Sequence, residues 1–179
     1  QSGSNSVLRR MRRQYTRERF LEIVNEFRNC GRHIALSTDV IVGSPGESKE
    51  DFEDTLSLVR QVEFESMFSF KYSPRPYTEA YEWEDDVPNQ VKTARLMILQ
   101  ELQAKIQLHL NLTSYVGRTF EVLVEGLSRD GINQFGRTAS NRIVNFPGAY
   151  TAGDFVNIQV NQAGTYSLKG TPLTELVNQ

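Results

Sequence analysis

With 179 residues, the chain is long enough to form one large hydrophobic core or two small ones. Its net charge of −2 does not by itself indicate a class of binding partner. The single cysteine, Cys30, excludes an internal disulfide framework and favours a reducing, cytoplasmic setting. No apolar run approaches the roughly 18–20 residues of a membrane-spanning helix, so we expect no membrane partner.

Two amphipathic helices are predicted in the first third of the chain. Apolar residues recur at helical spacing over 16–31, where Thr16 is suited to be the N-cap. The same spacing recurs over 48–62, where Ser48 and Asp51 form a capping box. Both segments therefore carry a start signal as well as a buried stripe.

Strands are predicted over 33–43 and 65–76, and a long helix begins near Pro88. In that helix the apolar side chains step by three or four, at Val91, Ala94, Ile98, Leu102, Ile106 and Leu110. The helical crossovers are long enough for parallel strands, which predicts an α/β unit that is either open or part of a (β/α) barrel. Two parallel strands are too few for a stable sheet, and the sequence lacks an initiator Met, so we expect a piece of a longer chain.

The sequence pattern changes near residue 112. Residues 118–126 and 154–170 alternate apolar and polar side chains, 141–146 is a short strand, and 128–137 has the composition of a turn. Short alternating strands with glycine turns predict a small antiparallel β-barrel. We therefore divide the chain into an α/β domain over 1–111 and a β-barrel domain over 112–179.

The segment "IVGSPGE", residues 41–47, joins an apolar strand to a bare glycine turn. Ligands of parallel α/β folds bind beyond the carboxyl ends of the strands, where Gly43 would allow close approach and Asp39 would offer a carboxylate. Lys71, Ser73 and Arg75 end the second strand at the same rim and suit a carboxylate or phosphate. An ordinary β–α turn would also explain residues 41–47, and a water-exposed strand end would also explain Lys71, Ser73 and Arg75. The pattern alone therefore does not decide whether a ligand binds here.

The barrel segment interleaves cations with aromatic residues, as single-strand-binding barrels do. These residues are Arg118, Arg129, Arg137, Arg142, Lys169, Phe135, Phe146, Tyr150 and Tyr166. The alternation also allows some of the aromatic residues to be core, so RNA binding and simple packing both fit.

Four motifs occur in order across both domains: "QSGSNSVLRRMRRQYTRERFLEIV", "STDVIVGSPGESKEDFEDTL", "FKYSPRPYT" and "GRTASNRIVNFPG". Together they resemble the radical-SAM methylthiotransferases, and most closely the branch that acts on N6-isopentenyladenosine in tRNA. The resemblance implies the later part of a radical-SAM partial (β/α) barrel, followed by an OB-like barrel called TRAM. It also implies a cytoplasmic enzyme that adds a methylthio group to C2 of that adenosine, next to the anticodon.

The resemblance further implies cofactors, partners and site residues. S-adenosylmethionine would be bound by Gln1, Ser2, Thr38, Asp39, Gly43 and Arg75. The tRNA anticodon stem-loop would be bound by Arg118, Arg137, Asn141, Arg142, Phe146 and Lys169. The family also holds two [4Fe–4S] clusters through cysteine thiolates, and the lone Cys30 matches no ligand position. We therefore expect no catalytic or metal-binding residue in this chain, and no activity from it alone.

Two other functions remain open from the sequence: a stand-alone RNA-binding module, and a sibling methylthiotransferase acting on a ribosomal protein or another modified adenosine. Half of a barrel also exposes strand edges and apolar surface, so we expect the chain to self-associate.

Overall fold

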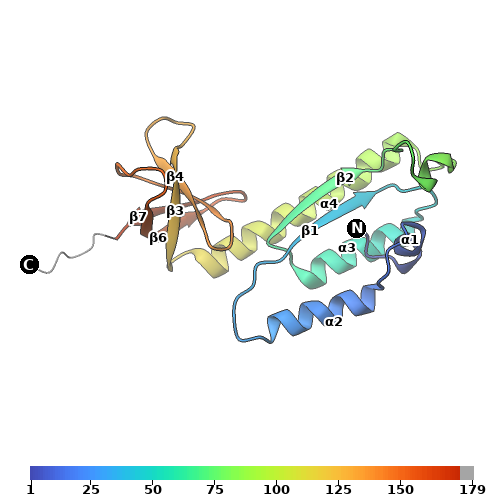
Figure 1. Ribbon diagram of the computed structural model, residues 1–179, viewed down its shortest axis with the longest axis horizontal. Coiled ribbons are helices and arrows are strands. Elements are labelled where there is room, and N and C mark those ends of the chain that lie inside the picture. The colour runs from blue at the N-terminus through green and yellow to red at the C-terminus, as the bar shows by residue number, and fades with distance from the viewer. Residues whose placement is uncertain (174–179) are drawn as a thin grey trace, which may run out of the picture. The chain divides into compact units, whose positions relative to one another are not determined.

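The computed structural model describes residues 1–173 and divides the chain into two compact units, Gln1–Ile106 and Gln107–Gln179. The predicted second domain, 112–179, includes residues 174–179, which lie outside the described residues. Helix α4 continues from the first unit into the second (Figure 1). None of the described helices is long and apolar enough to cross a membrane.

The first unit packs helices against a parallel strand pair, β1–β2 (Figure 1). Its elements are α1 (Asn5–Arg10), α2 (Arg17–Arg28), β1 (Ser37–Val42), α3 (Lys49–Val62), β2 (Ser66–Lys71), the 3-10 turn η1 (Glu79–Glu82) and α4 (Asn89–Leu110). The parallel pairing follows the predicted crossover, with Ser37 opposite Ser66 and Val42 opposite Lys71. Gln1 lies along the other edge of β1, where its carbonyl accepts the Ile41 N–H at 3.0 Å.

The start signals of α2 and α3 are confirmed. The Thr16 hydroxyl accepts the Arg19 N–H, and Ser48 and Asp51 make the reciprocal capping box. Helix α3 buries the predicted stripe, Phe52, Leu56, Val59 and Val62. These residues form the core between α3 and the strand pair together with Val40, Val42 and Phe64.

The buried face of α4 shares only Ile106 with the predicted stripe. Its buried residues are Lys92, Leu99, Gln103 and Ile106, whereas Ile98 is 49% exposed. Gln103 turns inward because its Nε2 donates to the Phe64 carbonyl at 2.8 Å, whereas its Oε1 has no hydrogen-bond partner among the described residues. Hydrogen-bonded polar groups are tolerated in a core, and a count of apolar positions does not detect them.

The second unit is a closed mixed barrel with the strand order β3-β4-β5-β7-β6. Its elements are the π-helical turn η2 (Asn111–Tyr115), β3 (Thr119–Leu127), β4 (Gln134–Thr138), β5 (Ile143–Phe146), β6 (Phe155–Ala163) and β7 (Leu168–Pro172). The predicted small OB-like barrel is confirmed. Its core contains Val122, Val124, Val144 and Ile158.

Two details of the barrel differ from the prediction. Part of the segment read as a turn, 134–137, belongs to strand β4, and β5 pairs with β7 in parallel. An odd number of strands cannot alternate in direction around a closed ring, so five strands must leave one parallel pair. The purely antiparallel barrel is therefore corrected to a mixed one.

Candidate functional site

The turn that follows β1 is held by a buried carboxylate. Glu47 accepts the Gly43 N–H at 2.9 Å and an Arg95 Nη1 hydrogen bond at 2.7 Å, and it is 5% exposed. Burial raises the pKa of Glu47, while the Gly43 N–H and the Arg95 cation act to lower it. The glutamate of "IVGSPGE" thus fixes the turn against α4.

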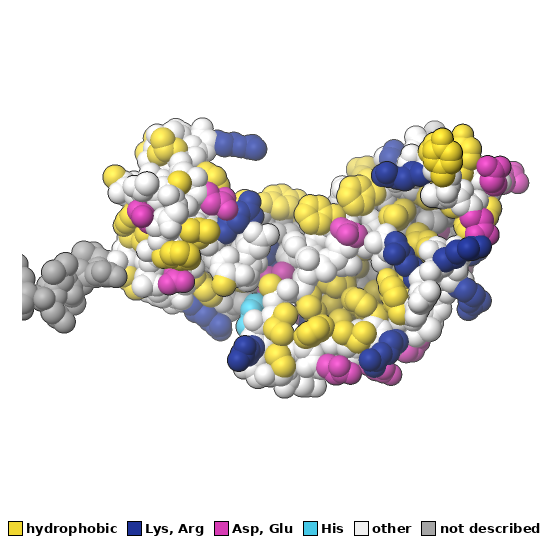
Figure 2. All heavy atoms as spheres, viewed as in Figure 1, with side chains coloured by type: hydrophobic (Ala, Val, Ile, Leu, Met, Phe, Trp, Pro, Cys, Tyr) yellow, Lys and Arg dark blue, Asp and Glu magenta, His cyan; other side chains and the backbone are white. Residues whose placement is uncertain are grey.

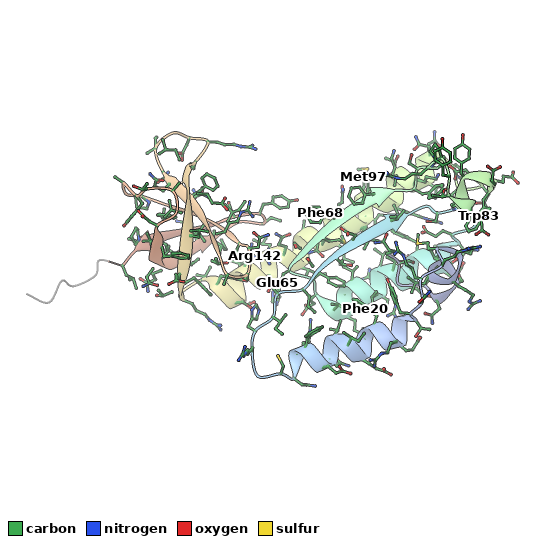
Figure 3. The ribbon with its side chains drawn as sticks, in the orientation of Figure 1. Phe20, Glu65, Phe68, Trp83, Met97 and Arg142 are labelled. Carbon is green, nitrogen blue, oxygen red and sulfur yellow. The ribbon has the colours of Figure 1, made fainter. Side chains whose placement is uncertain are left out.

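A cleft of about 760 Å³ opens at the carboxyl ends of β1 and β2. Three of the predicted cofactor residues line it: Gln1, Asp39 and Arg75. Asp39 is exposed and Val40 is buried, as expected for alternate residues of a strand that is covered on one face. Trp83 also lines the cleft, and it lies beyond the ends of the strands (Figure 3). The predicted location at the strand ends therefore holds a cavity of ligand size.

The cleft is positively charged and has unused hydrogen-bonding capacity. Arg10 and Arg13 join Arg75 in its lining. Arg10 Nη2 donates to the Gly46 carbonyl at 2.7 Å, which anchors its guanidinium at the rim. Ser44 also lines the cleft and is 5% exposed, and its hydroxyl has no hydrogen-bond partner among the described residues. Such a buried orphan hydroxyl fits a polar ligand.

The other three predicted cofactor residues face away from this cleft. Ser2 is buried and its hydroxyl lies 3.1 Å from Thr55 Oγ1, so it ties the start of the chain to α3. Thr38 faces a separate cavity between β1 and the helices, because it alternates with Asp39 along the strand.

Gly43 lies in the turn between β1 and α3 but is not among the residues that line the cleft. A Cβ at Gly43 would lie 2.3 Å from Lys92 Cγ, so its missing side chain makes room for α4. Lys92 in turn ends in an ion pair with Asp85, with an Nζ–Oδ2 distance of 2.5 Å. The bare turn therefore makes room for helix packing, and the approach of a ligand to Gly43 stays a prediction.

The cleft includes residues that the sequence prediction did not select, among them Arg10, Arg13, Phe70 and Trp83. The first two belong to the basic run "LRRMRR", which was a visible signal of anion binding. Phe70 alternates with the residues that face α4, so strand periodicity placed it on the cleft side. Nothing in the sequence near Trp83 indicated that it would return to the strand ends.

In the barrel, two of the predicted RNA-binding residues lie together. Arg137 Nη1 donates to Asn141 Oδ1 at 2.9 Å, at the β4–β5 turn where Asn141 has a φ of 63°. Arg137 Nε also donates to Glu125 Oε1 at 3.0 Å. This ion pair offsets much of the positive charge that a phosphate would require.

Phe146 and Arg142 are buried, in contrast to the predicted surface role. Phe146 is 1% exposed and packs against Tyr150, because even-numbered positions of β5 face the barrel core. Arg142 is 6% exposed, with its guanidinium 5.6 Å from the centre of the Tyr115 ring. Both side chains are therefore mostly enclosed by the barrel, and the RNA-binding role predicted for them stays a prediction. Arg118 and Lys169, in contrast, are exposed.

Comparisons with known proteins give the same two-part organisation. Residues 1–59 match the radical SAM superfamily, and residues 113–173 match the TRAM domain. The tRNA-2-methylthio-N(6)-dimethylallyladenosine synthase of Clostridium botulinum is 45% identical over 95% of this chain. The synthases of Anoxybacillus flavithermus and Bacillus licheniformis are each 44% identical over 99% of it. The chain thus contains a radical SAM segment and a TRAM domain, and it is similar to these synthases through both.

This chain covers only 38% of the Clostridium botulinum protein, 34% of that from Anoxybacillus flavithermus and 35% of that from Bacillus licheniformis. Within residues 1–173, no group of three or more His, Cys, Asp or Glu side chains is placed to hold a metal ion. Cys30 is exposed just after α2. The described part of this chain thus contains a cleft at the strand ends and a TRAM barrel, but no ligand set for a cluster.

Proposed function

We propose that this chain takes part in the methylthiolation of tRNA, with its first unit contributing to an S-adenosylmethionine site and its barrel holding the tRNA. The observation that carries the proposal is the similarity to tRNA-2-methylthio-N(6)-dimethylallyladenosine synthases, which extends over 95–99% of the chain and through both units. A relationship restricted to one unit would support only half of this assignment.

The residues of the cleft fit S-adenosylmethionine chemically. This cofactor presents an ammonium group, a carboxylate, ribose hydroxyls and a flat adenine ring. Asp39 would accept from an ammonium or hydroxyl group, Arg75 would pair with the carboxylate, and Phe70 and Trp83 offer apolar surface for the ring. The orphan Ser44 hydroxyl supplies one further hydrogen bond. When bound, the cofactor supplies the methyl group and the radical chemistry for which the superfamily is named.

The described residues do not fit an iron–sulfur cluster. Clusters need several cysteine thiolates, and the sequence contains one cysteine. The [4Fe–4S] clusters of the proposed enzyme would therefore be held outside this chain, and no reaction step is assigned to residues 1–173. The contribution of this chain is to bind and orient cofactor and tRNA.

The proposed substrate is N6-isopentenyladenosine next to the anticodon, recognised within the anticodon stem-loop, and the proposed compartment is the cytoplasm. The names of the relatives favour this substrate, because dimethylallyl and isopentenyl denote the same substituent here. They also disfavour a ribosomal-protein substrate. A stand-alone RNA-binding module is disfavoured because the α/β unit retains a cleft with an orphan buried hydroxyl.

The test is nucleoside mass spectrometry on tRNA from cells that lack the gene encoding this chain. We expect N6-isopentenyladenosine to accumulate and its 2-methylthio form to disappear, with recovery when the gene is restored. Restoration with Asp39→Ala should recover the methylthio nucleoside poorly, whereas Glu53→Ala, an exposed carboxylate on α3, should recover it fully. An unchanged methylthio nucleoside in the deletion strain would overturn the proposed substrate.

A further inference from the structure

The outer face of the barrel carries a row of three side chains across neighbouring strands. Phe135 on β4 lies opposite Asn145 on β5, and Asn145 lies opposite Lys169 on β7. The register therefore sets an aromatic ring, an amide and an ammonium group side by side on one surface. Of these three, only Lys169 was among the predicted RNA-binding residues.

Two loops rise beside this row and turn it into a groove of about 850 Å³. One is the β3–β4 loop, which carries Arg129, and the other is the β6–β7 loop, which carries Tyr166 (Figure 1). Tyr166 is 73% exposed. The groove lies within the size range of cavities that bind small ligands, about 300–1,000 Å³.

Both loops are fixed before any ligand binds. In the β3–β4 loop, Asp130 accepts the Ile132 and Asn133 N–H groups at 2.9 and 3.0 Å. Hydrogen bonds from Asn133 and then from Ser128 hold the pKa of Asp130 far below its usual range, so its negative charge is engaged within the loop. In the β6–β7 loop, the Asn111 amide donates to the Gly164 carbonyl at 2.8 Å. Preformed walls reduce the entropic cost of binding.

The position of the groove matches the barrel topology. The ring order β3-β4-β5-β7-β6, with β5 and β7 parallel, makes β4 and β5 the second and third strands of the barrel. OB-folds bind oligonucleotides on the face of strands 2 and 3, between the loop joining strands 1 and 2 and the loop joining strands 4 and 5. The groove is formed by the same strands and the same loops.

The chemistry of the groove selects the kind of nucleic acid. Within residues 1–173, Arg129 and Lys169 have no ion-pair partner, so both cations are free for phosphates. Phe135 and Tyr166 offer aromatic faces, which only an unstacked base can reach. We propose that this groove binds an unpaired segment of the RNA, with its bases on Phe135 and Tyr166 and its phosphates near Arg129 and Lys169. This inference rests on the proposed function and identifies where the barrel holds tRNA.

The test is fluorescence anisotropy of the whole chain with three labelled RNAs: a stem-loop, the same stem as a closed duplex, and a short single strand. We expect the stem-loop and the single strand to bind more tightly than the duplex. Tyr166→Ala should weaken stem-loop binding roughly 5- to 150-fold, whereas Tyr166→Phe, which keeps the ring, should retain it. The slope of log affinity against log salt concentration is negative, and Lys169→Met should make it less steep by about 0.7.

Arg60→Met is the matched control, because Arg60 is an exposed cation of α3 that does not line the groove and has no predicted role in RNA binding. Thermal unfolding of each variant checks that the barrel stays folded, which exposed positions should allow. Equal losses of affinity with Arg60→Met and Lys169→Met, or unchanged binding in both Tyr166→Ala and Lys169→Met, would overturn the proposed RNA site in the groove but leave the tRNA assignment standing. If the wild-type chain bound none of the three RNAs, both the proposed RNA site in the groove and the RNA-binding role of the barrel would be wrong. The nucleoside analysis would then test the enzyme assignment independently.

Discussion

Glu47 and Arg95 form an ion pair between the β1–α3 turn and α4, with Arg95 Nη1 2.7 Å from Glu47 Oε1 and side-chain exposures of 2% and 12%. The pair anchors the turn whose backbone forms one side of the cleft. Because it is buried, removing one partner leaves the other charge without compensation. We expect Arg95→Leu to destabilise the first unit by about 3–5 kcal/mol.

The measurement is urea unfolding followed by the fluorescence of Trp83, the only tryptophan of the chain, which lies in the first unit. The double variant Glu47→Leu/Arg95→Leu should lose much less stability than the two single variants added together. Additive losses would show that the two side chains do not interact in solution.

The requirement for glycine at position 43 has two physical causes, and the chain contains a control that separates them. Gly43 has a φ of 72° and its Cβ position meets Lys92, whereas Gly31 has a φ of 75° and open space around it. Gly31→Ala should cost about 1–2 kcal/mol from backbone strain alone. Gly43→Ala should cost about 1–3 kcal/mol more, because the side chain of Lys92 must move. Equal losses in the two variants, measured by Trp83 fluorescence, would contradict the contact with Lys92.

The sequence predicted the helices, the parallel crossover and the barrel because each depends on a local period or a cap. It did not predict what lies opposite Gly43, because Lys92 is 49 positions away in the chain and polar. Phe146 was misjudged for a related reason: an aromatic residue in a short strand has the same pattern whether it faces the core or solvent. Phe135 and Tyr166 were noticed as aromatic residues, but the groove between them requires strand registers that only the folded barrel supplies.

The exposed aromatic face of β2 predicts self-association. Phe68 is 64% exposed and Phe70 is 54% exposed. Figure 2 shows exposed hydrophobic side chains along β2, and Figure 3 labels Phe68 in the same orientation. Side chains two residues apart share a face of a strand, so the two rings form one apolar patch. We expect sedimentation velocity to show dimers or larger species at high concentration, and fewer of them for Phe68→Ser/Phe70→Ser. Tyr77→Ser, which removes a fully exposed ring elsewhere, should leave the distribution unchanged. A wild-type monomer at all concentrations would contradict this prediction.

Asp51 predicts a specific loss of stability in acid. Its carboxylate accepts the hydroxyls of Ser4 and Ser6, each at 2.5 Å, and completes the capping box with Ser48. Burial acts to raise the pKa of Asp51, but these hydrogen bonds outweigh it and lower the pKa from 3.8 to about 2. A lowered pKa means that the folded state favours the ionised form. The resulting stability is fully present above pH 4 and is lost as the pH falls toward 2.

The shift corresponds to about 2 kcal/mol of the free energy of unfolding of the first unit. We expect Asp51→Asn to be less stable than wild type at pH 6 by about this amount, and the difference to shrink as the pH falls from 4 to 2. Asp54→Asn makes the same chemical change at an exposed position of α3 and should follow the wild-type curve. Urea unfolding at four pH values, followed by Trp83 fluorescence, measures all three proteins. If the gap between wild type and Asp51→Asn stayed constant over this range, the Ser4 and Ser6 hydroxyls would not be stabilising the ionised carboxylate.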